Sequence, residues 1–319
     1  MRIIFMGTPD FSVGTMEALL EAGHDIVLAV TQPDKAKGRG KNLCFPPVKE
    51  AALAHGIPVY QPPRVREAEC VEYLASFRPD IIVVVAFGQI LPKEILMLPR
   101  YCCVNVHASL LPRYRGAAPI QWAVINGDSV SGVTTMRMDE GMDTGDIIDA
   151  EEVALAKDET GGSLFDRLAV VGAKLCVRTV ADIEAGTASF RPQDPAQATY
   201  TKMIHKQLGK VDFSRPAAEI ERLIRGLDPW PSAYTSLSGK TLKIWKADVV
   251  EPEKQDAVRR ESPEFLQPGT VCLATKEEML VAAGEGILSL REVQLEGKKR
   301  MDIASFLRGC PVEAGMALQ

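Results

Sequence analysis

The run DIIVVVA at residues 80–86 is the feature that most constrains how this chain can fold. A continuous β-branched run without polar alternation is typical of a strand buried on both faces, as in a parallel sheet. Similar runs stand at residues 2–6, 25–31 and 102–106, and a helical pattern at residues 12–22 ends at a glycine. Because strands that alternate with helices indicate βαβ units, we predict an α/β fold with a Rossmann-like, mainly parallel sheet.

The pattern changes in the second half of the chain. Two more strand-like runs and a long amphipathic helix at residues 162–185 complete the first predicted domain, the runs being 133–138 and 147–155. The segment FRPQDPAQATY then has two prolines and no apolar periodicity, which indicates a linker. We therefore predict a catalytic domain at residues 1–189, a linker at 190–207 and a second domain at 208–319.

The second domain is expected to be a small OB-like β-barrel. One helix at residues 216–227 precedes several short strand-like runs with turn signals between them, a pattern typical of such barrels. The runs are 235–237, 242–250, 269–274, 279–282 and 287–294. The polar stretch 251–264 between two of them is expected to be an exposed loop or insertion.

Composition limits the classes of protein that remain. A net charge of −5 over 319 residues argues against a protein that coats nucleic acid along its whole surface, although a local basic groove stays possible. No segment has the apolar length of a membrane helix, and the first apolar run is too short for a signal peptide. Seven cysteines without a C-x-x-C pair suggest neither a disulfide framework nor a zinc site. We expect a cytoplasmic protein with no metal and no membrane contact.

Polar side chains converge at the end of the strand at residues 102–106. Asn105 and His107 are two residues apart, so both emerge on one face of an extended strand, and the acidic turn MDEGMDTGD brings Asp143 opposite them. A lone histidine is as often a satisfied core residue, but three converging groups weaken that alternative. Acyl or formyl transfer to an amine needs donors for an oxyanion, here Asn105 and protonated His107, and a carboxylate that takes a proton. Ser109 has no G-x-S-x-G context, which favours a turn hydroxyl over a nucleophile.

Two nucleotide motifs are missing, and one basic loop stands out. GTPDFS follows the first strand without the second and third glycines of a dinucleotide fingerprint, and no P-loop is present. The segment QPDKAKGRGKNL, with Lys37, Arg39 and Lys41, concentrates cations around two glycines directly after a strand. Such a loop suits contact with phosphates, but a merely solvated basic loop is an equally good interpretation.

Several longer motifs stand along the chain: MRIIFMGTPDFS, PDKAKGRGKNLCFPPVK, VVVAFGQILP, NVHASLLPRYRGAAPIQWAVINGD, MDEGMDTGDI and LDPWPSAY. Together they resemble the motifs of a known family, the folate-dependent formyltransferases. The resemblance implies transfer of a formyl group from 10-formyltetrahydrofolate to the α-amino group of methionine on initiator tRNA. The product would be the N-formylmethionyl-tRNA that initiates translation.

The resemblance also implies roles for individual residues. Asn105, His107 and Asp143 fall on the family's catalytic trio, and the basic loop with Lys37, Arg39 and Lys41 falls on its tRNA-entering loop. The positions that fall on or beside the folate pocket are Phe87, Gly88, Gln89, Ile90, Leu91, Pro92, Ser109, Leu110, Leu111, Pro112, Asp139 and Gly141. The expected partners are initiator methionyl-tRNA and the folate donor, and we expect a monomer.

Two alternatives remain open at this point. A formyltransferase with a small acceptor, such as a sugar nucleotide or a purine precursor, would use the same chemistry but would explain neither the barrel nor the basic loop. A non-enzymatic OB-fold nucleic-acid binder would leave the trio unexplained. Residues 208–319 carry 16 lysines and arginines against 17 acids, so any tRNA surface there must be a one-sided patch. Its candidates are Lys240, Lys243, Lys246, Lys298, Lys299 and Arg300.

Overall fold

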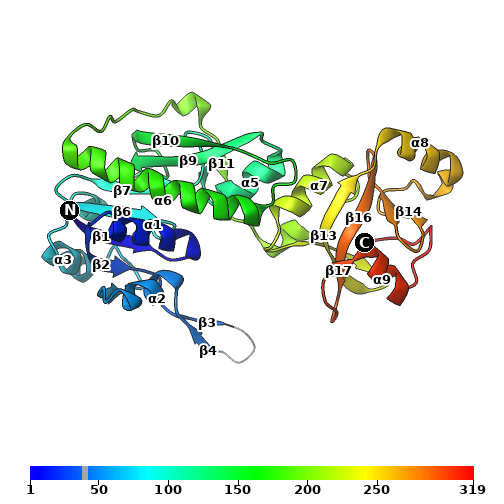
Figure 1. Ribbon diagram of the computed structural model, residues 1–319, viewed down its shortest axis with the longest axis horizontal. Coiled ribbons are helices and arrows are strands. Elements are labelled where there is room, and N and C mark those ends of the chain that lie inside the picture. Colours follow the sequence, from blue (N-terminus) through cyan, green and yellow to red (C-terminus); the bar gives the residue numbers. More distant parts are fainter. Residues whose placement is uncertain (38–41) are drawn as a thin grey trace. The chain divides into compact units, whose positions relative to one another are not determined.

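The computed structural model describes residues 1–37 and 42–319, which form two compact units (Figure 1). The first unit comprises Met1–Pro119, Val130–Ala154 and Phe165–Thr201, and the second comprises Ile120–Ser129, Leu155–Leu164 and Lys202–Gln319. Neither unit is one continuous stretch of chain. The boundaries 1–189, 190–207 and 208–319 therefore stay a prediction.

The first unit is built on a seven-stranded sheet with the order β10-β9-β7-β6-β1-β2-β5. Its strands are β1 (Arg2–Gly7), β2 (Asp25–Val30), β5 (Val59–Tyr60), β6 (Ile81–Val85), β7 (Cys103–His107), β9 (Val130–Arg137) and β10 (Ile147–Ala154). The five strands from β7 to β5 run parallel, whereas β9 and β10 are antiparallel to their neighbours. The predicted Rossmann-like, mainly parallel sheet is confirmed.

Helices and two small strand pairs complete this part of the chain. The helices are α1 (Asp10–Glu21), α2 (Pro47–Ala54), α3 (Ala68–Ser76), α4 (Lys93–Leu96) and, from Phe165 onward, α6 (Gly161–Ala185), whereas α5 (Pro119–Asn126) falls almost entirely in the second unit. The pairs are β3 (Lys35–Lys37) with β4 (Asn42–Cys44), and β8 (Arg115–Gly116) with β11 (Tyr200–Thr201). A short 3-10 helix, Pro195–Gln197, precedes β11. The prolines at 192 and 195 thus belong to a segment that pairs with the rest of the first unit rather than to an extended tether.

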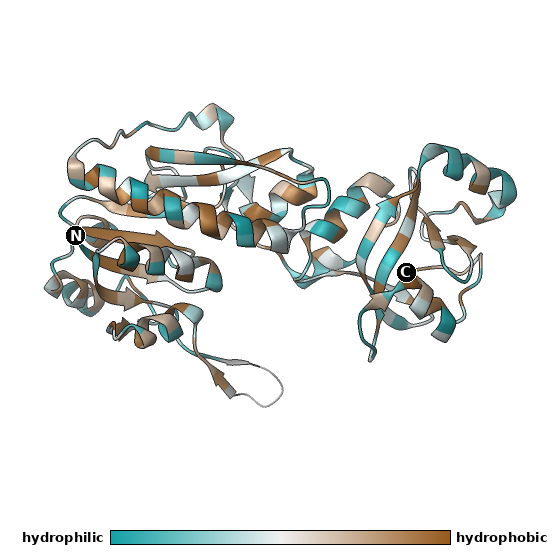
Figure 2. Cartoon of the chain, in the orientation of Figure 1, coloured by the Kyte–Doolittle hydropathy of each residue, from teal (hydrophilic) through white to brown (hydrophobic). Residues whose placement is uncertain are grey.

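The parallel strands are buried because helices cover both faces of the sheet. Alternate residues of β1, β2 and β6 pack with Cys70 and Leu74 of α3 and Ile95 of α4. On the opposite face, Phe11 of α1 meets Phe165 of α6 edge to face, with 5.2 Å between ring centroids. Figure 2 shows these strands as almost uniformly hydrophobic and α6 as alternately hydrophobic and polar. The β-branched runs therefore reflect burial on two sides.

The second unit is an antiparallel sheet of order β12-β13-β16-β15-β14, with β17 paired to β16. Its strands are β12 (Ala233–Leu237), β13 (Lys240–Val249), β14 (Val271–Ala274), β15 (Met279–Ala282), β16 (Ile287–Leu295) and β17 (Met301–Asp302). The C-terminal residues bridge to both edge strands: Leu318 pairs with Leu237 of β12, and Ala317 pairs with Thr270 beside β14. This tail joins the two edges as the closure of an OB-like barrel requires.

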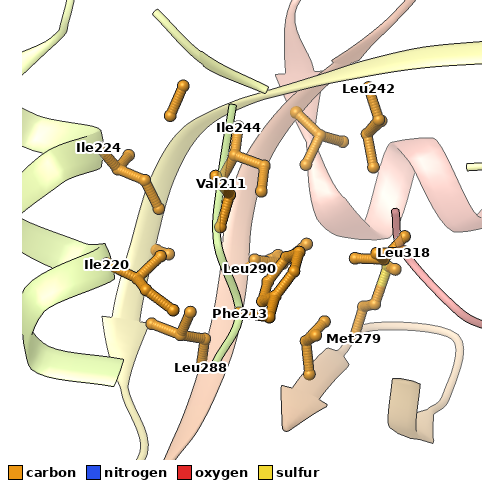
Figure 3. Packing of buried hydrophobic residues seen from close by; sticks show 14 of the residues in the cluster. Val211, Phe213, Ile220, Ile224, Leu242, Ile244, Met279, Leu288, Leu290 and Leu318 are labelled. Carbon is orange, nitrogen blue, oxygen red and sulfur yellow. The ribbon is translucent and has the colours of Figure 1, made fainter. Parts of the chain in front are cut away.

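Three helices and two short 3-10 turns accompany this sheet. They are α7 (Ala217–Gly226), α8 (Pro252–Glu261), α9 (Ile303–Gly309), and the 3-10 turns Lys206–Gly209 and Pro263–Phe265. Ile220 and Ile224 of α7 pack with Ile244 of β13 and Leu288 and Leu290 of β16 (Figure 3). The apolar positions of α7 thus recur at helical spacing, which explains why this helix was predictable.

The expectation of a loop at residues 251–264 is wrong. The chain forms α8 there, with a proline in the first turn, Glu253 near its N-terminus and Arg259 and Arg260 in its last turn. These charges complement the helix dipole. Only Val258 of this helix is buried. A helix that buries one side chain leaves no apolar periodicity in the sequence, so the pattern resembled a loop.

Candidate active site

The three residues predicted to carry chemistry lie together at the carboxyl edge of the sheet. Cys103, Asn105 and His107 share one face of β7, and Asp143 reaches this face from the turn after β9. Asp143 Oδ1 lies 3.4 Å from Asn105 Nδ2, and Asp143 Oδ2 lies 3.7 Å from His107 Nδ1. Ligands of open α/β sheets bind at this edge, close to the point where the strand order reverses, here between β1 and β6.

The orientation and tautomer of His107 are fixed by one backbone group. The ring is buried, and its Nε2 lies 2.9 Å from the carbonyl oxygen of Tyr114. Since a carbonyl only accepts, Nε2 carries the proton and donates it to this bond. Nδ1 is therefore the ring atom that faces Asp143.

The carboxylate of Asp143 is held by backbone and side-chain donors. The Gly116 amide donates to Oδ2 at 2.8 Å, in addition to the weaker bond from Asn105. Asp143 itself has φ of 54°, a left-handed conformation that is rare for a residue with a side chain. Gly116 has φ of 99°, and an added Cβ would lie 2.8 Å from the carbonyl oxygen of Thr201. Only glycine at 116 allows its amide this close approach.

Sequence reasoning missed two buried polar residues beside the turn. Gln193, in the segment predicted as a linker, donates from Nε2 to the carbonyl oxygens of Asp143 and Gly145 at 2.8 and 2.7 Å. Its Oε1 accepts from Nε and Nη2 of Arg115 at 3.1 and 2.7 Å. The sequence gives Gln193 no periodicity and no motif. Arg115 stands in the motif RYRG, but an arginine in a loop indicates no particular role, because any surface loop can carry one.

The residues predicted for the folate pocket divide into buried and exposed members. Phe87 and Leu91 are buried in the core of the first unit, and Ile90 is 79% exposed. Gln89 uses its amide inside the fold: Oε1 accepts from the Val65 amide at 2.8 Å, and Nε2 donates to the carbonyl of Pro62. Gly88 has φ of 83°, so the backbone turns sharply between the buried Phe87 and the exposed residues.

The second half of the predicted pocket lies beside the trio. Ser109 is buried and donates to the carbonyl of Arg113 at 2.7 Å, which agrees with a turn hydroxyl rather than a nucleophile. Leu111 is buried, whereas Leu110 and Pro112 are half-buried. Asp139 accepts from the Gly141 amide and from Thr144 Oγ1, at 3.0 and 2.7 Å, and so shapes the start of the acidic turn.

The basic loop is only partly described. Lys37 ends β3, and Arg39 and Lys41 lie outside the described residues. Among residues 1–37 and 42–319, no group of three or more His, Cys, Asp or Glu side chains is placed to hold a metal ion. No helix in this part of the chain is long and apolar enough to cross a membrane.

A Rossmann-like sheet with an amide, an imidazole and a carboxylate at its carboxyl edge, followed by a closed antiparallel sheet, defines a two-domain transferase. The comparisons with known proteins specify which one. A family model described as "Formyl transferase" matches residues 1–180, and "Formyl transferase, C-terminal domain" matches residues 203–311. The chain belongs to the formyl transferase family and, within it, to the methionyl-tRNA formyltransferases, as full-length relatives show.

The curated relatives and the solved structures differ in what they establish. "Methionyl-tRNA formyltransferase" of Agathobacter rectalis is 62% identical over 99% of this chain and 98% of its own length. The protein of that name from Lachnospira eligens is 58% identical over 100% and 99%. Among solved structures, WlaRD, a sugar 3N-formyl transferase, aligns with a TM-score of 0.65 and 19% identity, covering 94% of this chain and 99% of its own. HypX from Aquifex aeolicus with tetrahydrofolic acid aligns at 0.61 and 18%, covering 100% and 50%. At these identities the structures support the fold alone.

Proposed function

We propose that this protein transfers the formyl group of 10-formyltetrahydrofolate to the α-amino group of methionine on initiator tRNA. Full-length identity of 62% to a curated methionyl-tRNA formyltransferase supports the reaction and the acceptor. The observation that carries the chemistry is the distance of 3.7 Å between His107 Nδ1 and Asp143 Oδ2, with Asn105 beside them. These three groups supply a donor pair and a proton acceptor at one edge of the sheet.

Asn105 and His107 are proposed to bind the formyl oxygen. When the amine attacks the formyl carbon, the oxygen gains negative charge, and donors already aimed at it stabilise the tetrahedral intermediate. Asn105 Nδ2 is one donor, and a proton on His107 Nδ1 is the other, because Nε2 is already committed to Tyr114. Asp143 Oδ2 lies 3.7 Å from Nδ1, so its negative charge stands next to this proposed donor.

Asp143 is proposed to handle the proton that the reaction releases. The new bond joins the amine nitrogen to the formyl carbon, and the bond from that carbon to N10 of the folate breaks. One proton leaves the attacking nitrogen, and one proton must reach N10, so the transfer is balanced without a covalent intermediate on the enzyme. Asp143 is proposed to take part in both proton transfers through its Oδ1 and Oδ2 atoms, directly or through one water.

The folate donor is proposed to lie between Gly88–Pro92 and the acidic turn. Backbone groups around Gly88 are exposed there, while Phe87 and Leu91 pack below them and fix their position. Leu110 and Pro112 provide half-buried apolar surface on the side of the trio. Apolar walls with a few backbone donors and acceptors suit a planar pterin with polar edges.

The tRNA is proposed to meet the basic loop with Lys37, Arg39 and Lys41 and a patch on the second unit. There, the ring of Trp245 has Lys243 Nζ at 5.3 Å and the Arg300 guanidinium at 4.9 Å from its centroid. An aromatic ring beside two cations suits contact with bases and phosphates. Lys246, the next residue of β13, is exposed on the same unit.

A formylation assay with purified components tests this function and its alternatives together. The protein, 10-formyltetrahydrofolate and charged initiator methionyl-tRNA should give N-formylmethionyl-tRNA, which acid urea gels or mass spectrometry detect. Parallel reactions with an amino sugar nucleotide and with glycinamide ribonucleotide test small acceptors. Preference for either small acceptor would overturn the tRNA assignment, and tight RNA binding without any folate-dependent turnover would support the non-enzymatic alternative. Sedimentation of the same preparation tests the expected monomer.

A further inference from the structure

We propose that Gln193 is a positioning residue for Asp143 and that Arg115 strengthens this role by polarising the Gln193 amide. The inference rests on the proposed function, because it assigns a task to groups that surround the proposed catalytic trio. It concerns a residue that lies in the segment between the two matched family models rather than in any motif. Gln193 does not touch the reacting atoms and acts only through the turn that carries Asp143.

The turn that carries Asp143 has an unfavourable backbone conformation. Asp143 has φ of 54°, and Gly145 is so crowded that an added Cβ would lie 1.7 Å from the carbonyl oxygen of Arg137. A left-handed conformation is unfavourable for a residue with a side chain and persists only when its surroundings hold it. Gln193 supplies this hold because a single Nε2 donates to the carbonyl oxygens of both Asp143 and Gly145. The two bonds fix the Asp143–Thr144 and Gly145–Asp146 peptide groups.

The buried guanidinium of Arg115 binds the Gln193 side-chain amide from the other side. Arg115 is 3% exposed, and no carboxylate of the described chain forms an ion pair with it. Two of its donors converge on Gln193 Oε1, and Nη1 donates to the hydroxyl of Tyr200 at 3.2 Å. A cation that withdraws electrons through Oε1 makes the Nε2 protons of the same amide better donors. The buried charge of Arg115 thus helps to orient the acidic turn through Gln193.

The groups that bind His107 and Asp143 are held by one segment, residues 191–201. Thr199 accepts through its hydroxyl from the Tyr114 amide at 2.8 Å, and its carbonyl accepts from the Arg115 amide at 2.8 Å. Thr201 pairs with Gly116 in the small β8–β11 sheet. The segment therefore holds the carbonyl that binds His107, the amide that binds Asp143 and, through Gln193, the turn itself.

The test uses an isosteric substitution with a matched control in the same segment. Gln193→Glu keeps the side-chain shape and the bonds from Arg115 but replaces both N–H donors by an oxygen that repels the two carbonyls. Gln197→Glu makes the same chemical change at an exposed residue whose side-chain amide donates to Asp194. Gln193→Met, which removes both sets of bonds without adding charge, serves as the second variant if the glutamate variant does not fold.

Both Gln193 variants should lower kcat about 10- to 100-fold, since a misplacement of about 1 Å at a catalytic group costs this much. KM for folate and for tRNA should stay within about threefold of wild type, because Gln193 is buried and its bonds reach Asp143 and Gly145 rather than Asp139 or Gly141, the turn residues predicted for the folate pocket. Gln197→Glu should match wild type in all three constants. An unchanged kcat in both Gln193 variants, or equal losses in kcat and both KM values with a lowered Tm, would overturn the positioning role.

A second readout does not depend on the reaction. The Gly116 amide donates to Asp143 Oδ2, so its NMR resonance and hydrogen-exchange rate report whether the carboxylate is in place. In the Gln193 variants this amide should shift and exchange faster, while in Gln197→Glu it should not change. If wild type fails to formylate methionyl-tRNA, the proposed function fails and this measurement still decides the role of Gln193. A Gly116 amide that is unaltered in both Gln193 variants would overturn it.

Discussion

The carbonyl oxygen of Tyr114 lies 2.9 Å from Nε2 of His107 and so determines which ring nitrogen faces the candidate active site. Tyr114 has φ of 59°, and this left-handed turn carries its carbonyl back toward the end of β7. With Nε2 committed to this bond, the ring nitrogen opposite Asp143 is Nδ1. A loop seven residues further along the chain thereby sets the chemistry of a strand residue.

Asp143→Asn should separate the charge of this carboxylate from its shape. Asparagine still offers an oxygen to the Gly116 amide but can neither favour a protonated His107 nor accept a proton. We expect kcat to fall about 10²- to 10⁴-fold, the range for loss of a general acid or base, with little change in KM for folate. Single-turnover formylation of methionyl-tRNA measures it. The control is Asp149→Asn, a half-buried acid of β10 paired with Arg178. Comparable turnover in both variants would exclude the proposed role of Asp143.

Much of the fold was predictable because burial leaves a pattern in the sequence. The run IIVVV of β6 is completely buried, and the spacing of Asn105 and His107 placed both on one face of β7. The amphipathic helix α7 was visible for the same reason. For β6 the signal is the unbroken apolar run of a strand buried on both faces, and for β7 and α7 it is the period at which side chains return to one face.

The parts that the sequence did not predict depend on single contacts. Gln193 is buried although the segment in which it lies has two prolines and no apolar periodicity. Its side-chain amide donates to backbone carbonyls 48 and 50 residues away in the chain. The helix α8 buries only Val258, so its pattern matched a polar loop. Backbone turns such as those at Tyr114 and Asp143 are set by tertiary contacts, because local preference disfavours their positive φ values.

The free cysteines should differ sharply in reactivity. Five of the seven are buried, Cys310 is half-buried, and Cys44 is exposed. Burial raises the pKa of Cys102 and of Cys272 to about 11 and that of Cys176 to about 12, which suppresses the reactive thiolate. At pH 8, Ellman's reagent should label Cys44 rapidly and Cys310 slowly, and the other five only in denaturant. Cys44→Ser should remove the fast phase; rapid labelling of Cys176, located by mass spectrometry, would contradict this burial.

Asp302 should make the stability of the second unit dependent on pH. It caps α9, and hydrogen bonds from the Ser305 amide and hydroxyl, at 2.8 and 2.7 Å, hold the pKa of its carboxyl below the usual range. A folded-state pKa below the unfolded one gives stability that is present above the unfolded pKa. This stability is lost as pH falls through the folded pKa.

The effect of Asp302 can be measured by urea unfolding of wild type, Asp302→Ala and Asp302→Asn. At pH 7 the alanine variant should be less stable than wild type, and the difference should shrink as pH falls below about 4, the usual pKa of an aspartate. Asp302→Asn keeps a capping oxygen and should show less of this pH dependence. A deficit of the alanine variant that is the same at pH 7 and pH 3 would show that charge plays no part in the cap.

Lys246 should contribute to tRNA binding although residues 208–319 carry no net positive charge. Its cross-strand neighbour is Glu292, whose carboxylate is already bound by Arg300 at 2.6 Å, and no carboxylate of the described chain forms an ion pair with Lys246. The register of β13 shifts at this residue, a bulge that re-aims side chains. Its charge therefore remains available to a phosphate, beside Trp245 with its two cations.

Lys246→Ala should raise KM for methionyl-tRNA without changing KM for folate. If Lys246 binds one phosphate, the slope of log KM for tRNA against log salt should fall by about one, because one fewer counterion is released. The matched control is Lys254→Ala: this lysine belongs to the same unit but is paired with Glu278 at 2.5 Å, so its charge is already compensated. Its salt slope should equal that of wild type. Equal slopes for all three proteins would remove Lys246 from the RNA surface and leave Lys243, Arg300 and the basic loop to form it.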